Sequence, residues 1–361
     1  MRLVRQWEEL RGGCTEAAKL FGQLEDARAA ARPPISNFRV GAVARGLSGR
    51  VYLGCNLEFR GLGLQTCIHA EEFALISALN HREPRVVQLA LSTAPCGYCR
   101  QILAEAFFTL EAGEGSSVGA ALELFIRPNE TAMSLQDLLP MAFGPRDLGA
   151  SVSLFSPHHH PLERVQPAPG ATEASDALWE RLTEMALDFA ARSHAPYSNS
   201  PAGVALAIRS CEDEVAPSPS LQMAGEEMLG GSYYENCAFN PSISPMKAAI
   251  VAVVCAEKAL DRISHVVLVE VRRERGSETE NPFERTYQQT CLCFLHNCMR
   301  VQANDSLYSS CLPAVYLPLP DPLLSHTIPP SLHQFHPRPL LRFLHMRACC
   351  VGGGLTGFTS T

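Results

Sequence analysis

One histidine, one glutamate and two cysteines stand at spacings that suit hydrolytic chemistry at a metal ion. His69 precedes Glu71 by two positions, and Cys96 and Cys99 follow later as a Cys-x-x-Cys pair behind a proline. Catalytic zinc sites commonly use three such protein ligands and keep the fourth position for water. A carboxylate beside that water can move its protons without binding the metal. The pattern predicts zinc ligands at His69, Cys96 and Cys99, with Glu71 as the catalytic acid and base.

Each half of this pattern has another interpretation when it is taken alone. A Cys-x-x-Cys pair can be a redox couple or half of a structural zinc site, and a lone His-x-Glu triplet is common. The proline before Cys96 and the distance between the two halves favour a catalytic metal when both occur together.

The segments that must position these residues alternate between helical and extended patterns. Residues 3–30 have helical spacing, although Gly12 and Gly13 allow two shorter helices instead. The pattern further predicts a hairpin of residues 39–45 and 50–56, a helix over 69–80, a buried strand over 86–92 and a helix over 96–108. This order indicates an α/β fold, a mixed sheet with helices packed on it.

The expected helices put the four chemical residues at two helix N-termini. His69 and Glu71 begin one helix, and Cys96 and Cys99 share the first turn of another. The partial positive charge at a helix N-terminus lowers a thiol pKa and favours the thiolates that zinc requires. Arg100 is expected to hydrogen-bond the ligand sulfurs.

The residues around this centre make the pattern more specific. Four separated stretches occur in a fixed order: Ser36-Asn37-Phe38-Arg39-Val40-Gly41-Ala42, Gly54-Cys55-Asn56-Leu57-Glu58-Phe59, Cys67-Ile68-His69-Ala70-Glu71-Glu72 and Pro95-Cys96-Gly97-Tyr98-Cys99-Arg100-Gln101. With the later stretch at 139–145, they resemble the cytidine deaminase family, in its larger, two-core homodimeric form known from bacteria and plants. The resemblance covers roughly residues 1–285.

The resemblance implies hydrolysis of cytidine and deoxycytidine to uridine and deoxyuridine, as in pyrimidine salvage. By the same resemblance Phe38, Asn56 and Glu58 hold the nucleoside, and backbone groups at Ala70 and Cys96 read the base. A Glu58 carboxylate bound to the 3′-hydroxyl would repel a 3′-phosphate and so favour free nucleosides. The alternative for Glu58 is an ordinary surface glutamate at a strand end.

The second half of the chain repeats the first without its metal residues. Residues 195–205 echo 33–43, and residues 231–236 echo 54–59. Counting onward from Glu235 puts Met246 opposite His69 and Ala248 opposite Glu71, and no Cys-x-x-Cys follows at the corresponding distance. Two tandem three-layer α-β-α cores are therefore expected, the second one degenerate. The expected division is a catalytic core over 1–155, a linker over 156–175, a degenerate core over 176–290 and an atypical tail over 291–361.

The linker and the tail carry histidines and cysteines that could be considered as further metal ligands. His158-His159-His160 lies between prolines, and a solvated loop is the plainer interpretation than a second metal site. Residues 291–361 hold six of the fourteen cysteines, at spacings that fit no metal pattern. This tail is expected to have little order, because the last helix and strands of the family are not recognisable in it.

Composition restricts the partners. A formal net charge of −7 argues against a nucleic-acid binder, and no apolar run is long enough to cross a membrane. The acidic residues near the N-terminus disfavour a secretory or transit signal, so a cytosolic protein with reduced thiols is expected. Two other functions remain open: a polynucleotide cytidine deaminase, and an inactive binding or assembly protein with an altered C-terminus. In the homodimer that the resemblance implies, Phe143 reaches the partner's pocket; otherwise it is a plain core aromatic.

Overall fold

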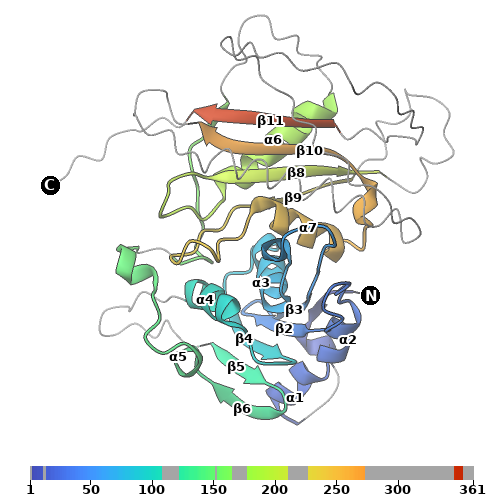
Figure 1. Ribbon diagram of the computed structural model, residues 1–361, viewed down its shortest axis with the longest axis vertical. Helices are drawn as coiled ribbons and strands as arrows, with labels where there is room; N and C mark the ends of the chain where they lie inside the picture. The colour runs from blue at the N-terminus through green and yellow to red at the C-terminus, as the bar shows by residue number, and fades with distance from the viewer. Residues whose placement is uncertain are drawn as a thin grey trace, which may run out of the picture.

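Two sheets, each with helices on both faces, make up the part of the chain that the computed structural model describes (Figure 1). This part comprises residues 2–10, 14–107, 122–150, 153–164, 177–209 and 227–272, together with the backbone of 345–352. The mixed sheets with flanking helices confirm the expected α/β class and the two tandem three-layer cores.

The first sheet has six strands in the order β1-β3-β2-β4-β5-β6. They are β1 (Val4–Gln6), β2 (Gly41–Gly46), β3 (Arg50–Cys55), β4 (Val86–Leu91), β5 (Glu123–Ile126) and β6 (Asn129–Met133). Helices α1 (Glu16–Phe21) and α2 (Leu24–Ala29) pack on one face, and α3 (Ala70–Asn80) and α4 (Gly97–Ala106) lie on the other. Shorter helical segments are η1 (Trp7–Glu9), η2 (Leu64–Thr66), α5 (Leu135–Leu138) and η3 (Pro145–Leu148).

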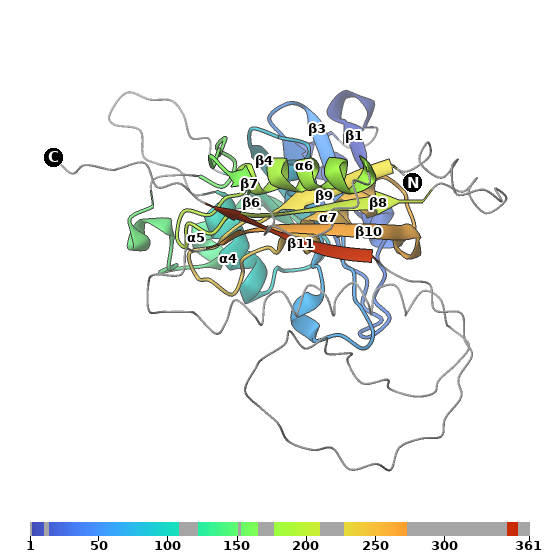
Figure 2. The same ribbon diagram turned by 90° about the horizontal axis from the view of Figure 1, so that it is seen from above.

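The second sheet has the order β7-β11-β10-β8-β9. Its strands are β7 (Glu163–Arg164), β8 (Ala202–Ile208), β9 (Glu227–Ser232), β10 (Ile263–Arg272) and β11 (His345–Gly352). Helix α6 (Ala177–Ala191) lies on one face (Figure 2), and α7 (Pro245–Cys255) packs on the other, followed by η6 (Leu260–Arg262). The strands β9-β8-β10-β11 repeat the order and the pairing directions of β3-β2-β4-β5.

The hydrogen bonds of the two cores repeat as closely as their strands do. Glu58 accepts from the N–H groups of Ile35 and Ser36, each at 2.9 Å. Glu235 accepts in the same way from the N–H groups of Tyr197 and Ser198, at 2.8 and 3.1 Å. Both carboxylates also receive the hydroxyl of the serine in their own loop. The internal repeat inferred from the sequence is therefore a structural repeat.

The structure corrects the alignment of the two cores after this point. The short bridge of Leu57 with Ile68 corresponds to that of Tyr234 with Ile243. The loop from Glu235 to Ile243 is therefore two residues shorter than the loop from Glu58 to Ile68. The alignment made from the sequence had no gap here, so it put Met246 opposite His69 and Ala248 opposite Glu71. Both assignments were wrong by two positions. Ser244 corresponds to His69 and Met246 to Glu71, which still leaves the second core without the ligand and the carboxylate.

Two glycines bring each inner helix close to its sheet. A Cβ at Gly54 would lie 2.1 Å from the carbonyl oxygen of Ala70, in the first turn of α3. A Cβ at Gly231, the matching residue of β9, would lie 2.4 Å from the backbone nitrogen of Ala249 in α7. Because glycine has no side chain, both helices can rest directly on the strand. The contact at Gly54 therefore fixes how closely the N-terminus of α3 approaches the first sheet.

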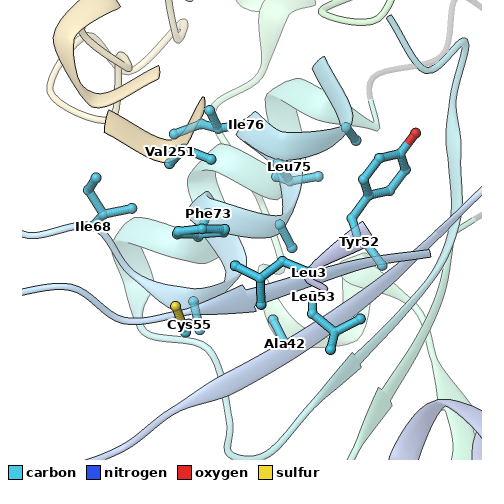
Figure 3. Close-up of a cluster of buried hydrophobic side chains, with 14 of the residues drawn as sticks. Leu3, Ala42, Tyr52, Leu53, Cys55, Ile68, Phe73, Leu75, Ile76 and Val251 are labelled. Atoms are coloured by element: carbon cyan, nitrogen blue, oxygen red, sulfur yellow. The ribbon is translucent and has the colours of Figure 1, made fainter. Parts of the chain in front are cut away.

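Helices α3 and α7 lie between the two sheets and pack against each other (Figure 1). In the close-up of the apolar core, Ile76 of α3 and Val251 of α7 face each other above Phe73 and Leu53 (Figure 3). All four side chains are fully buried. One hydrophobic cluster therefore continues from the first core into the second, and its burial holds the two cores together.

Two local expectations need correction. The N-terminal segment does not begin as a helix, because Val4–Gln6 pairs with β3 as strand β1, and the first α-helix starts only at Glu16. The tail expected to have little order contributes β11, which lies parallel to β10 in the second core as β5 lies parallel to β4 in the first. The remaining cysteines and prolines of 291–361 fall outside the described residues. Among the helices that the structure describes, none has the length and apolar character needed to cross a membrane.

Candidate active site

His69, Cys96 and Cys99 converge from the N-termini of two neighbouring helices. His69 is the residue before α3, Cys96 is the residue before α4, and Cys99 lies in the first turn of α4. The His69 Nδ1 atom lies 3.3 Å from the Cys99 Sγ and 3.5 Å from the Cys96 Sγ. The three ligand atoms lie within 4.8 Å of one another. The predicted trio thus forms a compact group that could hold one metal ion.

The local charges favour a thiolate in this group. Hydrogen bonds with Cys99 and with the His69 ring lower the pKa of Cys96 to about 3. The N–H groups at the start of α4 act in the same direction, because a helix N-terminus stabilises negative charge. A thiolate is the form of cysteine that binds metal.

Glu71 lies in the first turn of α3, directly beside the group. Its side chain is buried, and burial raises the pKa of its carboxyl although a hydrogen bond with Cys99 opposes that shift. A buried carboxylic acid that contacts a ligand sulfur is placed to exchange protons with anything bound next to the metal.

Three of the four predicted substrate residues, Phe38, Asn56 and Glu58, lie on or against one neighbouring loop. Asn56 accepts a hydrogen bond from Val40 N and donates one to the Phe38 carbonyl, both at 2.9 Å. Glu58 holds the loop two residues earlier through Ser36. These bonds fix the backbone of residues 35–40 and leave the Phe38 side chain 60% exposed. Ala70 is fully buried, whereas Cys96 is exposed, so the surface open to a ligand lies on the α4 side of the group.

Comparisons with known proteins assign the chain to a family. Two sequence models of the cytidine and deoxycytidylate deaminase zinc-binding region match it, one over residues 15–109 and the other over 135–215 and 211–281. The cytidine deaminase of Cronobacter sakazakii is 38% identical over 239 residues, which are 66% of this chain and 68% of that protein. The cytidine deaminase of Yersinia pestis is 36% identical over 258 residues, 72% of this chain and 75% of that protein.

The chain belongs to the cytidine and deoxycytidylate deaminase family.

The geometry of the trio fits the metal of this deaminase family. Tetrahedral zinc with Zn–S near 2.3 Å and Zn–N near 2.05 Å puts a ligand sulfur about 3.6 Å from a ligand nitrogen. The observed separations of 3.3 and 3.5 Å agree with that value. One nitrogen and two sulfurs are also a donor set that zinc accepts.

Arg100 acts on the loops around the deaminase site and not on the sulfurs. Its Nε donates to the Pro95 carbonyl at 2.9 Å, and its Nη1 donates to the Leu138 carbonyl at 2.8 Å. The expectation of hydrogen bonds from Arg100 to the ligand sulfurs is therefore wrong. The guanidinium fixes the turn before Cys96, because its planar fork can hold two carbonyls at once.

Sequence reasoning missed the residues that support the trio. Glu72 Oε2 accepts from the backbone N–H of His69 at 3.2 Å, and the Tyr98 ring lies 5.6 Å from the His69 ring. His69 is the N-cap residue of α3, and Glu72 is the third residue of that helix. A glutamate at this position commonly caps the backbone N–H of the N-cap residue, so spacing alone could have predicted this hydrogen bond. Lys247, which bonds to Glu72, comes from the second core and had no such signal.

The histidine triplet is not the solvated loop that was expected. His158 and His160 are half-buried, and His160 Nε2 bonds to the Ser193 carbonyl at 3.0 Å. His158 Nε2 lies 3.0 Å from His194 Nδ1. Within the described residues this triplet forms no group of metal-ligating atoms. Two of its three rings, those of His158 and His160, instead bond to residues of the second core.

Proposed function

We propose that this protein removes the 4-amino group of cytidine and deoxycytidine by hydrolysis. The products are uridine or deoxyuridine and ammonia. The observation that supports this most directly is the trio of His69, Cys96 and Cys99 with buried Glu71 against it. Family membership and the named activity of the Cronobacter and Yersinia relatives support the same reaction.

The proposed roles follow from the positions of the side chains. His69, Cys96 and Cys99 would hold the zinc ion, which when bound supplies Lewis-acid activation of a water molecule at neutral pH. Glu71 would take one proton from that water and give it to ring nitrogen N3. It would then take the second proton from the C4 hydroxyl of the tetrahedral adduct and give it to the departing amine. The C4–O bond forms, the C4–N bond breaks, and ammonia leaves. The hydrogen bond between Glu71 and Cys99 holds the carboxyl group beside the metal ligands, where one residue can carry both protons.

The loop of residues 35–40 supplies the proposed nucleoside contacts. Asn56 and Glu58 would bind the sugar hydroxyls, and the exposed Phe38 ring would cover the base. Glu58 already accepts three hydrogen bonds from this loop, which pre-organise its carboxylate as an anion. An anion at that position repels a 3′-phosphate, so free nucleosides are favoured over polynucleotides.

We place the functional unit as a cytosolic homodimer with a catalytic core over 1–155 and a supporting core over 176–290. Phe143 is 48% exposed, which does not suit a plain core aromatic. Its carbonyl accepts a hydrogen bond from Gln101 on α4, so the exposed ring lies next to the metal helix. Phe239, 67% exposed, follows Cys237, which contacts the same carbonyl. Two exposed aromatic rings beside a site suit burial by a second subunit.

A substrate panel tests the proposed reaction. The zinc-loaded protein is incubated with cytidine, deoxycytidine, cytidine 3′-monophosphate and a cytosine-containing single-stranded oligonucleotide, and ammonia release is measured. We expect turnover of the two nucleosides and little turnover of the other substrates. Turnover of the oligonucleotide alone would indicate a polynucleotide deaminase, and no turnover of any substrate would indicate an inactive binding protein.

A further inference from the structure

The second core sends one charged side chain into the support of the first core's metal site. Lys247 Nζ lies 2.9 Å from Glu72 Oε1, and this ion pair is almost completely buried, with Glu72 at 0% exposure. The other oxygen of Glu72 accepts the N–H of His69 at 3.2 Å. A single carboxylate therefore joins the lysine of α7 to the backbone of a proposed zinc ligand.

The pair lies where the two repeats meet. In the corrected alignment Ser244 corresponds to His69, so Lys247 is the counterpart of Glu72 itself. Equivalent positions of two repeated helices thus carry opposite charges and bind each other. Two glutamates at these positions would repel across the contact between α3 and α7. At this position the second core carries a base where the first core carries an acid, and the two side chains form one ion pair.

The contacts of Lys247 extend to the other side of the metal group. Its Nζ lies 3.5 Å from the Tyr98 hydroxyl and 5.6 Å from the centre of that ring. Tyr98 stands between Cys96 and Cys99 in the sequence, and its ring contacts the His69 ring. One ammonium group is therefore in contact with the support of the histidine ligand and with the residue between the two cysteine ligands.

We propose that Lys247 is a positioning residue for the zinc site, acting through Glu72 on His69. The ion pair fixes the rotamer of Glu72, and Glu72 fixes the backbone of His69 at the start of α3. Residues that orient metal ligands in this way commonly change metal affinity by about 10-fold to 100-fold when they are replaced. This inference rests on the proposed zinc ligands but not on the identity of the substrate. It gives the degenerate core a defined contribution to the centre that it lacks.

Zinc affinity of the folded protein is the primary measurement, obtained by competition with a chromogenic chelator. We expect Lys247→Met to weaken zinc binding about 10-fold or more while circular dichroism shows a folded chain. Lys258→Met is the matched control, because this half-exposed lysine of the same core pairs with Glu227 at the surface. It should leave zinc affinity unchanged. A folded Lys247→Met protein with wild-type zinc affinity would overturn the proposal.

An exchanged pair separates positioning from folding. The double variant Glu72→Lys, Lys247→Glu keeps a buried ion pair, but a lysine at position 72 cannot accept the His69 N–H. We expect its thermal stability to approach that of the wild type while zinc affinity stays about 10-fold low. If zinc affinity returned to the wild-type value, the link through Glu72 would be refuted. This variant carries the test by itself if Lys247→Met does not fold.

Activity provides a second readout that distinguishes the two proposals. At limiting zinc, Lys247→Met should lose kcat for cytidine with an unchanged KM, and excess zinc should restore kcat. A wild-type protein without cytidine turnover would refute the proposed reaction, and the zinc-affinity difference between Lys247→Met and Lys258→Met would still decide the positioning role. Loss of kcat that excess zinc does not restore would count against positioning of the metal.

Discussion

Glu105 of α4, the helix that carries Cys99, and His194 of the second core form a buried contact, with 3.1 Å between Oε1 and Nε2. The same oxygen accepts the Tyr197 hydroxyl at 2.7 Å, and the second oxygen accepts the Cys237 N–H at 2.9 Å. Burial alone would raise the pKa of Glu105, but these hydrogen bonds hold it below its usual value. A carboxylate at one end of α4 is thus fully satisfied by the second core, while the other end carries Cys96 and Cys99.

Replacement of Glu105 should weaken the junction of the two cores. In Glu105→Gln an NH2 group replaces one of the two carboxylate oxygens. It then faces either the Cys237 N–H or the Tyr197 hydroxyl and His194, each of which loses its acceptor, so a buried donor is left unsatisfied. We expect the free energy of unfolding to fall by about 1–3 kcal/mol, measured by urea denaturation. Glu25→Gln removes a carboxylate that is 62% exposed and should change stability by less than about 0.5 kcal/mol. Equal effects of the two variants would contradict the buried role of Glu105.

The junction should also make stability depend on pH. Burial and the neighbouring His194 lower the pKa of His158 to about 4, below the value near 6.5 of an unfolded chain. The unfolded state therefore binds more protons between these values, and the contribution of His158, full above pH 6.5, is lost as the pH falls toward 4. Because His158 is only half-buried, we expect on the order of 1 kcal/mol after solvent screening.

Urea denaturation at several pH values between 7 and 4.5 measures this effect. His158→Gln should flatten the dependence of unfolding free energy on pH, because the titrating ring is removed. His159→Gln, at the exposed neighbouring position, should leave the dependence as in the wild type. A His158→Gln protein with an unchanged slope would show that the pH dependence has another source.

Glu58 and Glu235 offer a matched pair for separating substrate binding from loop support. Each carboxylate accepts two backbone N–H groups and one serine hydroxyl from the equivalent loop. Glu235→Gln should therefore lower stability by about 1–3 kcal/mol, and Glu58→Gln by less, because Glu235 is buried and Glu58 is only partly so. Only Glu58→Gln should raise KM for cytidine, by about 10-fold, and reduce discrimination against cytidine 3′-monophosphate. A similar KM increase in Glu235→Gln would assign the effect to loop stability.

Metal content should be one zinc ion per chain. The first core has the trio, whereas the second has Ser244 and Met246 at the corresponding positions of its helix. Cys99→Ala should reduce the zinc content of purified protein, measured by atomic emission, to below about one tenth of an ion per chain. Cys14→Ser, which removes an exposed cysteine outside the trio, should retain the full ion. Two ions per wild-type chain would mean that a second site exists.

The trio and the hairpin could be predicted because both depend on local sequence. His69 and the two cysteines occupy helix starts that spacing alone indicates, and the strands 41–46 and 50–55 flank a Ser48-Gly49 turn. The strand Val4–Gln6 could not be predicted in the same way. Its residues also fit a helical period, and only pairing with β3 decides the outcome.

The features that depend on contacts between distant segments could not be predicted from the sequence. The register of the repeat needed the bridge of Tyr234 with Ile243, because a two-residue gap in a loop leaves no periodic signal. The Lys247–Glu72 pair joins residues 175 positions apart, and its value to His69 depends on burial. Arg100 was misassigned since its reach to the Leu138 carbonyl depends on how a distant segment returns to α4.

The role of Glu71 is the central claim, and one comparison tests it most directly. Wild type and Glu71→Gln, both shown to contain one zinc ion per chain, are assayed for ammonia release from cytidine at saturating substrate. Glutamine keeps the shape of the side chain but cannot carry the proton, so we predict a loss of kcat of about 10²-fold or more, with KM little changed. Wild-type kcat in zinc-loaded Glu71→Gln would contradict the account.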